Sequence, residues 1–206
     1  MTLRRPKFFT AILITFITLT ACSQAPAEPP VLTGTAWTLD GEASELSYVT
    51  IKSGEIAEAN SFEGLSGSVS ADGAASIEID LASVSTGVDI RDERMREVLF
   101  VVADNPSATV TAQIDPVAFE ALGIGESAQT TLEGTLSLKG IEAPFLAEVT
   151  VTRAGADRVL AVSNAPVIVE ASRFELTDGL EQLQELAGLP SITPVVPVSF
   201  SLSFTR

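Results

Sequence analysis

Apolar and polar residues alternate with a period of two through most of this chain, and this alternation constrains its fold. The clearest case is the C-terminal segment 196–204, where five apolar residues alternate with serines at 199, 201 and 203. Successive side chains of a β-strand point to opposite faces, so each such segment has one apolar and one polar face. The pattern predicts an all-β protein whose strands face water on one side only.

Similar segments recur along the chain. We expect strands at 36–40, 44–52, 56–70, 77–81, 107–114, 131–139, 145–151, 158–170 and 196–204. The strands on either side of Gly140 are expected to form a hairpin. Eight or nine antiparallel strands of this kind either close into a barrel or pack as a sandwich, and the unbroken alternation favours a single barrel. An eight-stranded barrel is just wide enough to hold one small ligand.

Two short helices are expected between the strands. Asp89 can cap a helix over 90–100. Asp178 and Glu181 form an acidic capping box for a second helix, which ends at Gly188. This second helix is either a plug that closes one end of the barrel or a mobile lid over a ligand.

The N-terminus has the features of an export signal. A basic segment at 4–7 precedes twelve mostly apolar residues at 8–19, and small residues then lead to Cys22, the only cysteine. The arrangement resembles a bacterial lipoprotein signal, in which the cysteine is acylated and becomes the new N-terminus. A transmembrane helix needs ~20 apolar residues, so the anchor would be lipid. The alternative is a plain secretory peptide with an incidental cysteine.

This signal implies a division of the chain into three parts. Residues 1–21 would be removed, and residues 22–35, which are small, polar and proline-rich, would form a flexible tether. The packed domain is expected at 36–206. Ser23 stands where an aspartate retains some lipoproteins in the inner membrane, so we expect an outer-membrane lipoprotein that faces the periplasm.

Composition argues against several functions. The chain has no histidine, which removes Ser-His-Asp and Cys-His catalysis and the usual zinc sites. Without residues 1–21 it keeps nine basic and all twenty-seven acidic residues, a net charge of −18, which would repel nucleic acid. We expect no enzymatic activity, cofactor, metal or nucleic-acid partner. Paired carboxylates, as in glycosidases, are the alternative route to acid–base chemistry.

Six motifs follow one another along the chain. They are Trp37-Thr38-Leu39-Asp40, Ser61-Phe62 with Gly64, Leu81–Thr86 followed by Arg91-Asp92, Gly134–Gly140, Ala171–Leu176 and Val196–Phe200. In order and spacing they resemble the YceI-like family of lipocalin-like, polyisoprenoid-binding proteins. The resemblance covers 36–206 and implies an antiparallel barrel around an apolar tunnel that holds a long isoprenoid or similar lipid.

The resemblance makes the apolar strand faces both core and tunnel wall. The residues it implies for ligand contact are Phe62, Phe100, Leu136, Phe145, Phe174, Phe200 and Arg91. An alternating aromatic residue is also typical of an ordinary core. The guanidinium of Arg91 either binds an anionic head group or forms a structural ion pair that holds its helix against the barrel.

The leading hypothesis is a lipid-anchored envelope protein that carries a long-chain isoprenoid or similar lipid in its barrel. The alternative is an envelope interaction or stress-related module. Its barrel would be filled by its own side chains, and it would bind a protein partner. The volume of the interior distinguishes the two, because ligand pockets usually enclose ~300–1,000 Å³.

Replacing Cys22 with serine tests the anchor, because it removes the sulfur that would carry an acyl chain. The variant is expected to leave the detergent phase for the aqueous phase, since two or more acyl chains are needed for firm attachment. Phase partition and mass spectrometry of the purified protein measure this. A variant that stays in the detergent phase with the lipid mass unchanged would contradict the predicted anchor.

Overall fold

The computed structural model of this chain describes residues 31–206. The predicted signal at 1–21, Cys22 and the first part of the predicted tether lie outside the described residues. The strands are β1 (Trp37–Leu39), β2 (Glu45–Lys52), β3 (Ile56–Phe62), β4 (Leu65–Val69), β5 (Ala74–Asp80), β6 (Val84–Ser85), β7 (Ser107–Gln113), β8 (Ser127–Leu138), β9 (Ile141–Arg153), β10 (Arg158–Ser163), β11 (Val167–Glu170) and β12 (Val195–Thr205).

Short helical segments connect these strands. Two of them are α-helices, α1 (Asp89–Arg94) and α2 (Thr177–Ala187), and α1 continues directly into the π-helix η3 (Met95–Leu99). The 3₁₀ turns are η1 (Gly41–Ala43), η2 (Leu81–Ser83), η4 (Pro116–Phe119) and η5 (Ala171–Phe174).

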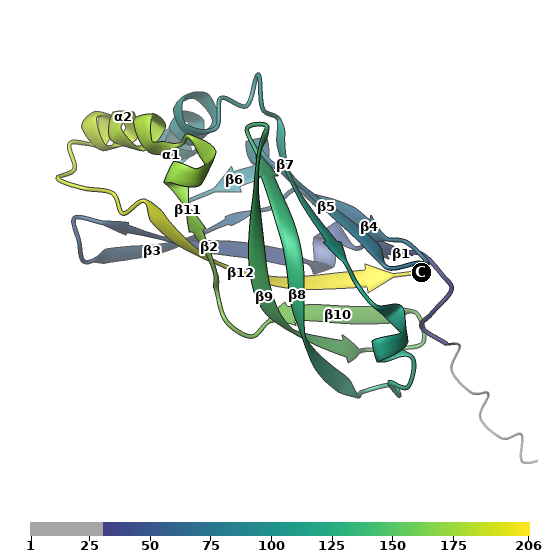
Figure 1. Ribbon diagram of the computed structural model, residues 1–206. Coiled ribbons are helices and arrows are strands. Elements are labelled where there is room, and N and C mark those ends of the chain that lie inside the picture. The colour runs from purple at the N-terminus through teal and green to yellow at the C-terminus, as the bar shows by residue number, and fades with distance from the viewer. Residues whose placement is uncertain (1–30) are drawn as a thin grey trace, which may run out of the picture.

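The strands form one antiparallel sheet that closes on itself (Figure 1). The closed ring runs β1–β4–β5–β7–β8–β9–β10–β12, and Thr38 of β1 lies opposite both Thr205 and Ser68. Closure pairs the strand edges that an open sheet would expose. The predicted fold, a single antiparallel lipocalin-like barrel of about eight strands with two short helices, is confirmed.

The remaining strands extend the barrel wall at one end. β1 and β2 lie on the same side of β12, where Leu39 faces Phe204 and Glu45 faces Ser201. β11 extends the line of β10 on the other side of β12 in the same way. The wall therefore reaches beyond the closed ring, toward α1 and α2.

Two predicted strands are each divided in the structure. Segment 56–70 breaks at Gly64, whose N–H donates to Ser83 Oγ at 2.8 Å and whose missing Cβ would lie 2.8 Å from Asp80 Cβ. Segment 158–170 breaks before β11, where Pro166 has no N–H to donate to a neighbouring strand. Each division has a local cause, a close backbone approach in the first and a missing donor in the second.

The β8–β9 hairpin forms around Gly140 as predicted. Leu138 pairs with Ile141 across a two-residue turn. Lys139 and Gly140 in this turn both have positive φ, at 52° and 75°. A type I′ turn requires this left-handed conformation at both central residues, and its twist suits the flanking strands.

The helices differ in detail from the prediction. The segment predicted as one helix over 90–100 starts as α1 and becomes a π-helix at Met95. The caps predicted at Asp89 and Asp178 are wrong, because both residues lie inside their helices and no side chain caps either N-terminus. The predicted end at Gly188 is confirmed, with φ at 63°.

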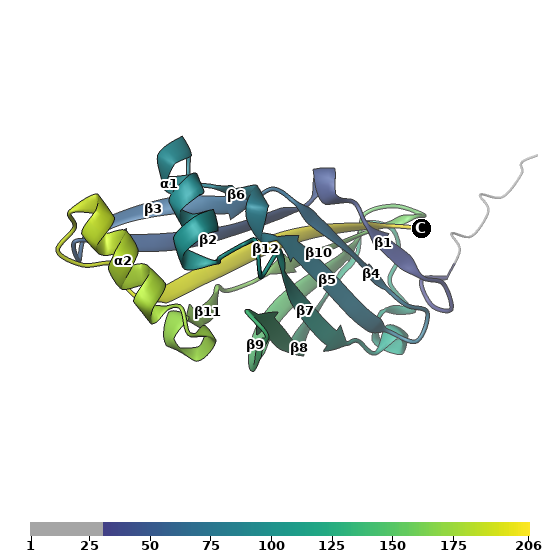
Figure 2. The ribbon, with the colours of Figure 1, turned by 90° about the horizontal axis from the view of Figure 1, so that it is seen from above.

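α1, η3 and α2 gather at one end of the barrel, which we call the helix end (Figure 2). α2 packs directly on η3 through Gly179, whose missing Cβ would lie 3.1 Å from Val98 O and 3.2 Å from Leu99 Cα. A larger side chain there would force the two helices apart. The chain terminus at Arg206 and the first described residues lie at the opposite end (Figure 1).

The described part of the predicted tether packs on this opposite end. Leu32 is buried, and its carbonyl oxygen accepts a hydrogen bond from the Trp37 indole N–H at 3.2 Å. The Arg206 guanidinium donates to Val31 O at 2.6 Å and lies 4.8 Å from the Trp37 ring centroid. The packed part of the chain therefore begins before the predicted boundary at residue 36, because Leu32 is apolar enough to join the core.

Gly134 of β8 makes room for an aromatic ring. It lies opposite Phe145 of β9, and a Cβ at Gly134 would lie 2.5 Å from Phe145 Cζ and 3.1 Å from Thr111 O. Neither the ring nor the strand backbone can move away without disturbing the wall.

Gly134→Ala is therefore expected to lower the free energy of unfolding by about 1–3 kcal/mol through overpacking. Gly155→Ala is the matched control, because its Cβ would meet nothing closer than Arg158 Cβ at 3.8 Å. Chemical denaturation of both variants measures the difference. Equal stabilities of the two variants would contradict the packing described for Gly134.

Candidate functional site

The barrel encloses a cavity of about 580 Å³. Residues of α1, η3, η5 and α2 and of every strand of the closed ring except β1 contribute to its wall. The volume lies in the range of small-molecule sites. A barrel filled by its own side chains, the alternative expected from the sequence, does not fit this interior.

Small side chains on the inward faces of the strands leave this space open. Six alanines of the strands line the cavity: Ala75, Ala108, Ala112, Ala143, Ala147 and Ala161. Each presents one methyl group where leucine or isoleucine would fill the interior. The outward neighbours remain in water, as in β9, where Ala147 is 2% exposed and Leu146 is 64% exposed. The alternation thus separates cavity wall from outer surface residue by residue.

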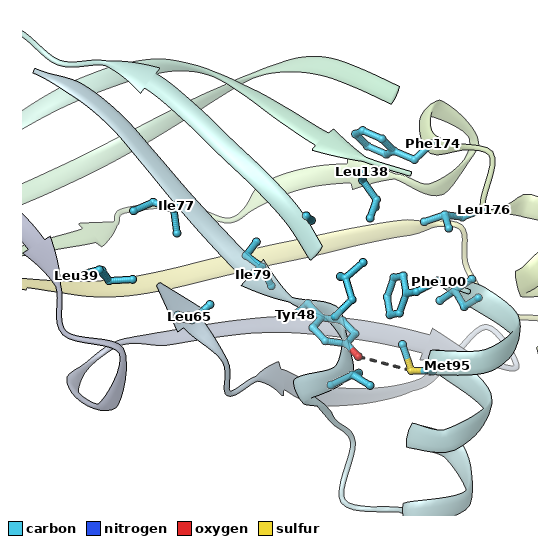
Figure 3. Close-up of a cluster of buried hydrophobic side chains, with 14 of the residues drawn as sticks. Leu39, Tyr48, Leu65, Ile77, Ile79, Met95, Phe100, Leu138, Phe174 and Leu176 are labelled. Atoms are coloured by element: carbon cyan, nitrogen blue, oxygen red, sulfur yellow. Dashed lines mark hydrogen bonds between the residues drawn. The ribbon is translucent and has the colours of Figure 1, made fainter. Parts of the chain in front are cut away.

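The structure brings the predicted contact residues together. All seven lie in the cavity wall: Phe62, Phe100, Leu136, Phe145, Phe174, Phe200 and Arg91. Three aromatic residues form a cluster, in which the Phe62 ring centroid lies 5.3 Å from that of Tyr48 and 5.8 Å from that of Phe100. Figure 3 shows Tyr48, Phe100 and Met95 side by side. Contact of these residues with a ligand stays a prediction.

Arg91 of α1 forms an ion pair with the barrel. Its Nη1 lies 2.7 Å from Glu58 Oε2 on β3, and Lys52 Nζ on β2 lies 2.6 Å from the same oxygen. The hydrogen bond from Lys52, together with the charge of Arg91, lowers the pKa of the Glu58 carboxyl below its ordinary value. An anionic ligand on Arg91 would have to displace Glu58, so the arrangement fits the structural ion pair, one of the two predicted roles.

The neighbouring Asp92 holds the start of α1 in place. Its Oδ1 accepts hydrogen bonds from the Thr86 N–H at 2.9 Å and from the Thr86 hydroxyl at 2.5 Å. Asp92 therefore fixes the loop before the helix.

Sequence reasoning missed two polar residues of the cavity wall, Tyr48 and Asn60. They are cross-strand partners on β2 and β3 and are both buried. The sequence contains a signal for Asn60. This residue lies two positions before Phe62, so the alternation places its polar side chain on the inward face of the strand. The Tyr48 hydroxyl donates to Met95 Sδ at 3.7 Å. Burial, with a smaller effect from Asp92, raises the pKa of Tyr48, so the phenol stays protonated at neutral pH.

No group of three or more His, Cys, Asp or Glu side chains within residues 31–206 could hold a metal ion. No helix in that same part of the chain is long and apolar enough to cross a bilayer.

Comparisons with known proteins agree with this geometry. Residues 37–204 match the YceI-like domain. A polyisoprenoid binding domain from Saccharophagus degradans, implicated in plant cell wall breakdown, is 36% identical with a TM-score of 0.80, over 82% of this chain and 98% of that chain. BcnA from Burkholderia cenocepacia shares the fold at 20% identity and a TM-score of 0.62, over 80% of this chain and 98% of its own. No curated protein matches the chain.

The ion pair predicts a pH-dependent contribution of Glu58 to stability. Glu58→Gln is expected to lower the free energy of unfolding by about 0.5–1 kcal/mol at neutral pH, a modest value because the Glu58 side chain is 32% exposed. The pKa of Glu58 is lower in the folded than in the unfolded chain. Its contribution is therefore complete above the unfolded pKa and is lost as the pH falls through the folded pKa.

Denaturation of wild type and variant at about pH 7 and about pH 3 measures this loss. Glu133→Gln, at an exposed position of β8, serves as the control and is expected to change little at either pH. A Glu58→Gln effect of the same size at both pH values would rule out the ion pair as its cause.

Proposed function

This chain belongs to the family of YceI-like domain proteins, and on that premise we propose that it carries a long-chain isoprenoid or similar lipid inside its barrel. The observation that carries the proposal is the cavity of about 580 Å³, whose wall is mostly apolar. The Saccharophagus degradans relative, a polyisoprenoid binding domain, supports this class of ligand. The activity is binding and transfer, and no covalent step is required.

Burial of the ligand chain supplies the affinity. Each Å² of apolar surface removed from water contributes roughly 25 cal/mol, offset by the ordering of the chain and of the side chains around it. The alanines of the wall leave room for the methyl branches of an isoprenoid.

We infer that the ligand enters at the helix end. The opposite end is closed by Trp37, Phe119 and Leu32, which are buried but take no part in the cavity wall. At the helix end, Leu180 and Leu183 of α2 line the cavity instead. α2 packs on η3 through Gly179, and Arg94 Nη1 of α1 donates a hydrogen bond to Leu186 O at 3.3 Å. Displacement of α2 would open the cavity, which makes α2 a lid.

We also propose that acylated Cys22 anchors the protein in the cell envelope, in the outer membrane and facing the periplasm. The sequence features of residues 1–23 support this location. A short tether raises the effective concentration of the barrel at the bilayer that supplies or receives the lipid. The described chain begins at the end opposite the lid, which leaves the lid accessible.

Ala147→Phe tests the cavity as the binding site, because it places a ring on the inner face of β9. Partition of radiolabelled geranylgeraniol between protein and phosphatidylcholine vesicles measures binding. The substitution is expected to weaken binding at least about tenfold through lost space. Leu146→Phe is the matched control, one residue away on the outer face, and should bind as wild type does.

Thermal unfolding of both variants checks that each is folded. A wild-type protein that takes up no geranylgeraniol would refute the proposed function. A folded Ala147→Phe variant that binds as well as wild type would place the binding site elsewhere.

A further inference from the structure

Asn60 carries an unused hydrogen-bond acceptor inside the cavity wall. Its residue is 5% exposed, and its Oδ1 is the buried side-chain polar atom without a hydrogen-bond partner among residues 31–206. The amide nitrogen is engaged, donating to Thr50 Oγ1 at 3.1 Å and to Glu58 O at 3.3 Å. Turning the amide over would set its oxygen against the Glu58 carbonyl, two acceptors, so the orientation is fixed.

A buried acceptor without a donor destabilises the folded protein. Native structures rarely leave such an atom unmatched, and each exception calls for a specific reason. Asn60 lines the cavity, so a shift of the side chains that cover its Oδ1 would let a ligand supply the missing donor.

Tyr48 supplies a complementary group directly across the ladder. It pairs with Asn60 in the β2–β3 register and lines the same cavity. Directly opposite side chains on one face lie within about 4.5–5.5 Å at Cβ. The Tyr48 hydroxyl donates to Met95 Sδ at 3.7 Å, and a thioether is a weak acceptor (Figure 3). An oxygen of the ligand would be a stronger acceptor for this donor.

We propose that Tyr48 and Asn60 form a binding site for the hydroxyl group of a long-chain isoprenoid alcohol. The Tyr48 hydroxyl donates to the alcohol oxygen, and the alcohol O–H donates to Asn60 Oδ1. This inference rests on the proposed function and narrows its ligand to a neutral chain that ends in a hydrogen-bond donor.

The charges near the site disfavour a diphosphate. An ionised diphosphate offers only acceptors, which would face Asn60 Oδ1 without a proton between them. Four cations line the cavity. Lys52 and Arg91 are already paired with Glu58. Arg173 is paired with Glu170, and Arg94 donates to Leu186 O at 3.3 Å. Asp92 adds a second carboxylate whose charge acts on Tyr48. The site therefore selects an alcohol over its diphosphate ester.

Three probes with the same hydrocarbon chain test this selection: geranylgeraniol, its methyl ether and geranylgeranyl diphosphate. The ether keeps the acceptor oxygen but has no proton to donate. Dissociation constants for the wild-type protein without its signal segment are measured by competition against radiolabelled geranylgeraniol. We expect the alcohol to bind about tenfold more tightly than the ether and more tightly than the diphosphate.

Two variants separate the two hydrogen bonds. Asn60→Leu removes the acceptor at similar volume and is expected to bind the alcohol and the ether equally. Tyr48→Phe removes only the donor and is expected to weaken both ligands, because both retain the oxygen. If Asn60→Leu does not fold, the comparison of the three probes on wild type still decides the question.

Equal binding of alcohol and ether by wild type would overturn the inference, since the proton of the alcohol would then add nothing to binding. Tightest binding of the diphosphate would overturn it as well. Both outcomes leave the proposed function standing, because the protein still binds the isoprenoid chain of the probe. Failure of all three probes to bind would instead refute the proposed function itself.

Discussion

Pairing of the short strand β1 with both β4 and β12 closes the barrel, and the interior depends on that closure. Thr38 contributes to both pairings, opposite Thr205 and Ser68. Without it the sheet would expose two edges and the inward faces would meet water. Trp37, at the start of β1, is packed against Leu32 and Arg206, so closure and the seal of this barrel end involve the same few residues.

A closed barrel holds a cavity only where the side chains on the inner faces of its strands are small. Alanines on the inner faces leave the space open, while larger residues such as Phe100 and Phe174 close around it near the helix end. The polar residues Tyr48 and Asn60 also lie toward the helix end of the cavity. Tyr48 and Asn60 lie where the extended wall of β2 and β3 meets η3, so a ligand can lie in the barrel with its polar end near the helix end.

Much of the fold follows from the alternation, because inward and outward positions are determined residue by residue. In the strand expected at 145–151, the alternation puts Ala147 on the apolar face, and Ala147 is 2% exposed. The breaks at Gly64 and Pro166 were missed because they interrupt hydrogen bonding without interrupting the pattern. The caps failed because Asp89 and Asp178 lie inside their helices. The cavity volume could not be predicted, since it depends on how inward side chains from different strands meet across the barrel.

We propose that the interior holds an isoprenoid lipid. Native mass spectrometry of the protein extracted gently from its own membranes tests this most directly, with the bound molecule then released into organic solvent and identified. We expect one apolar molecule per barrel, with an isoprenoid chain and a hydroxyl end. A protein that emerges with its barrel empty, or with a ligand that has no long apolar chain, would contradict it.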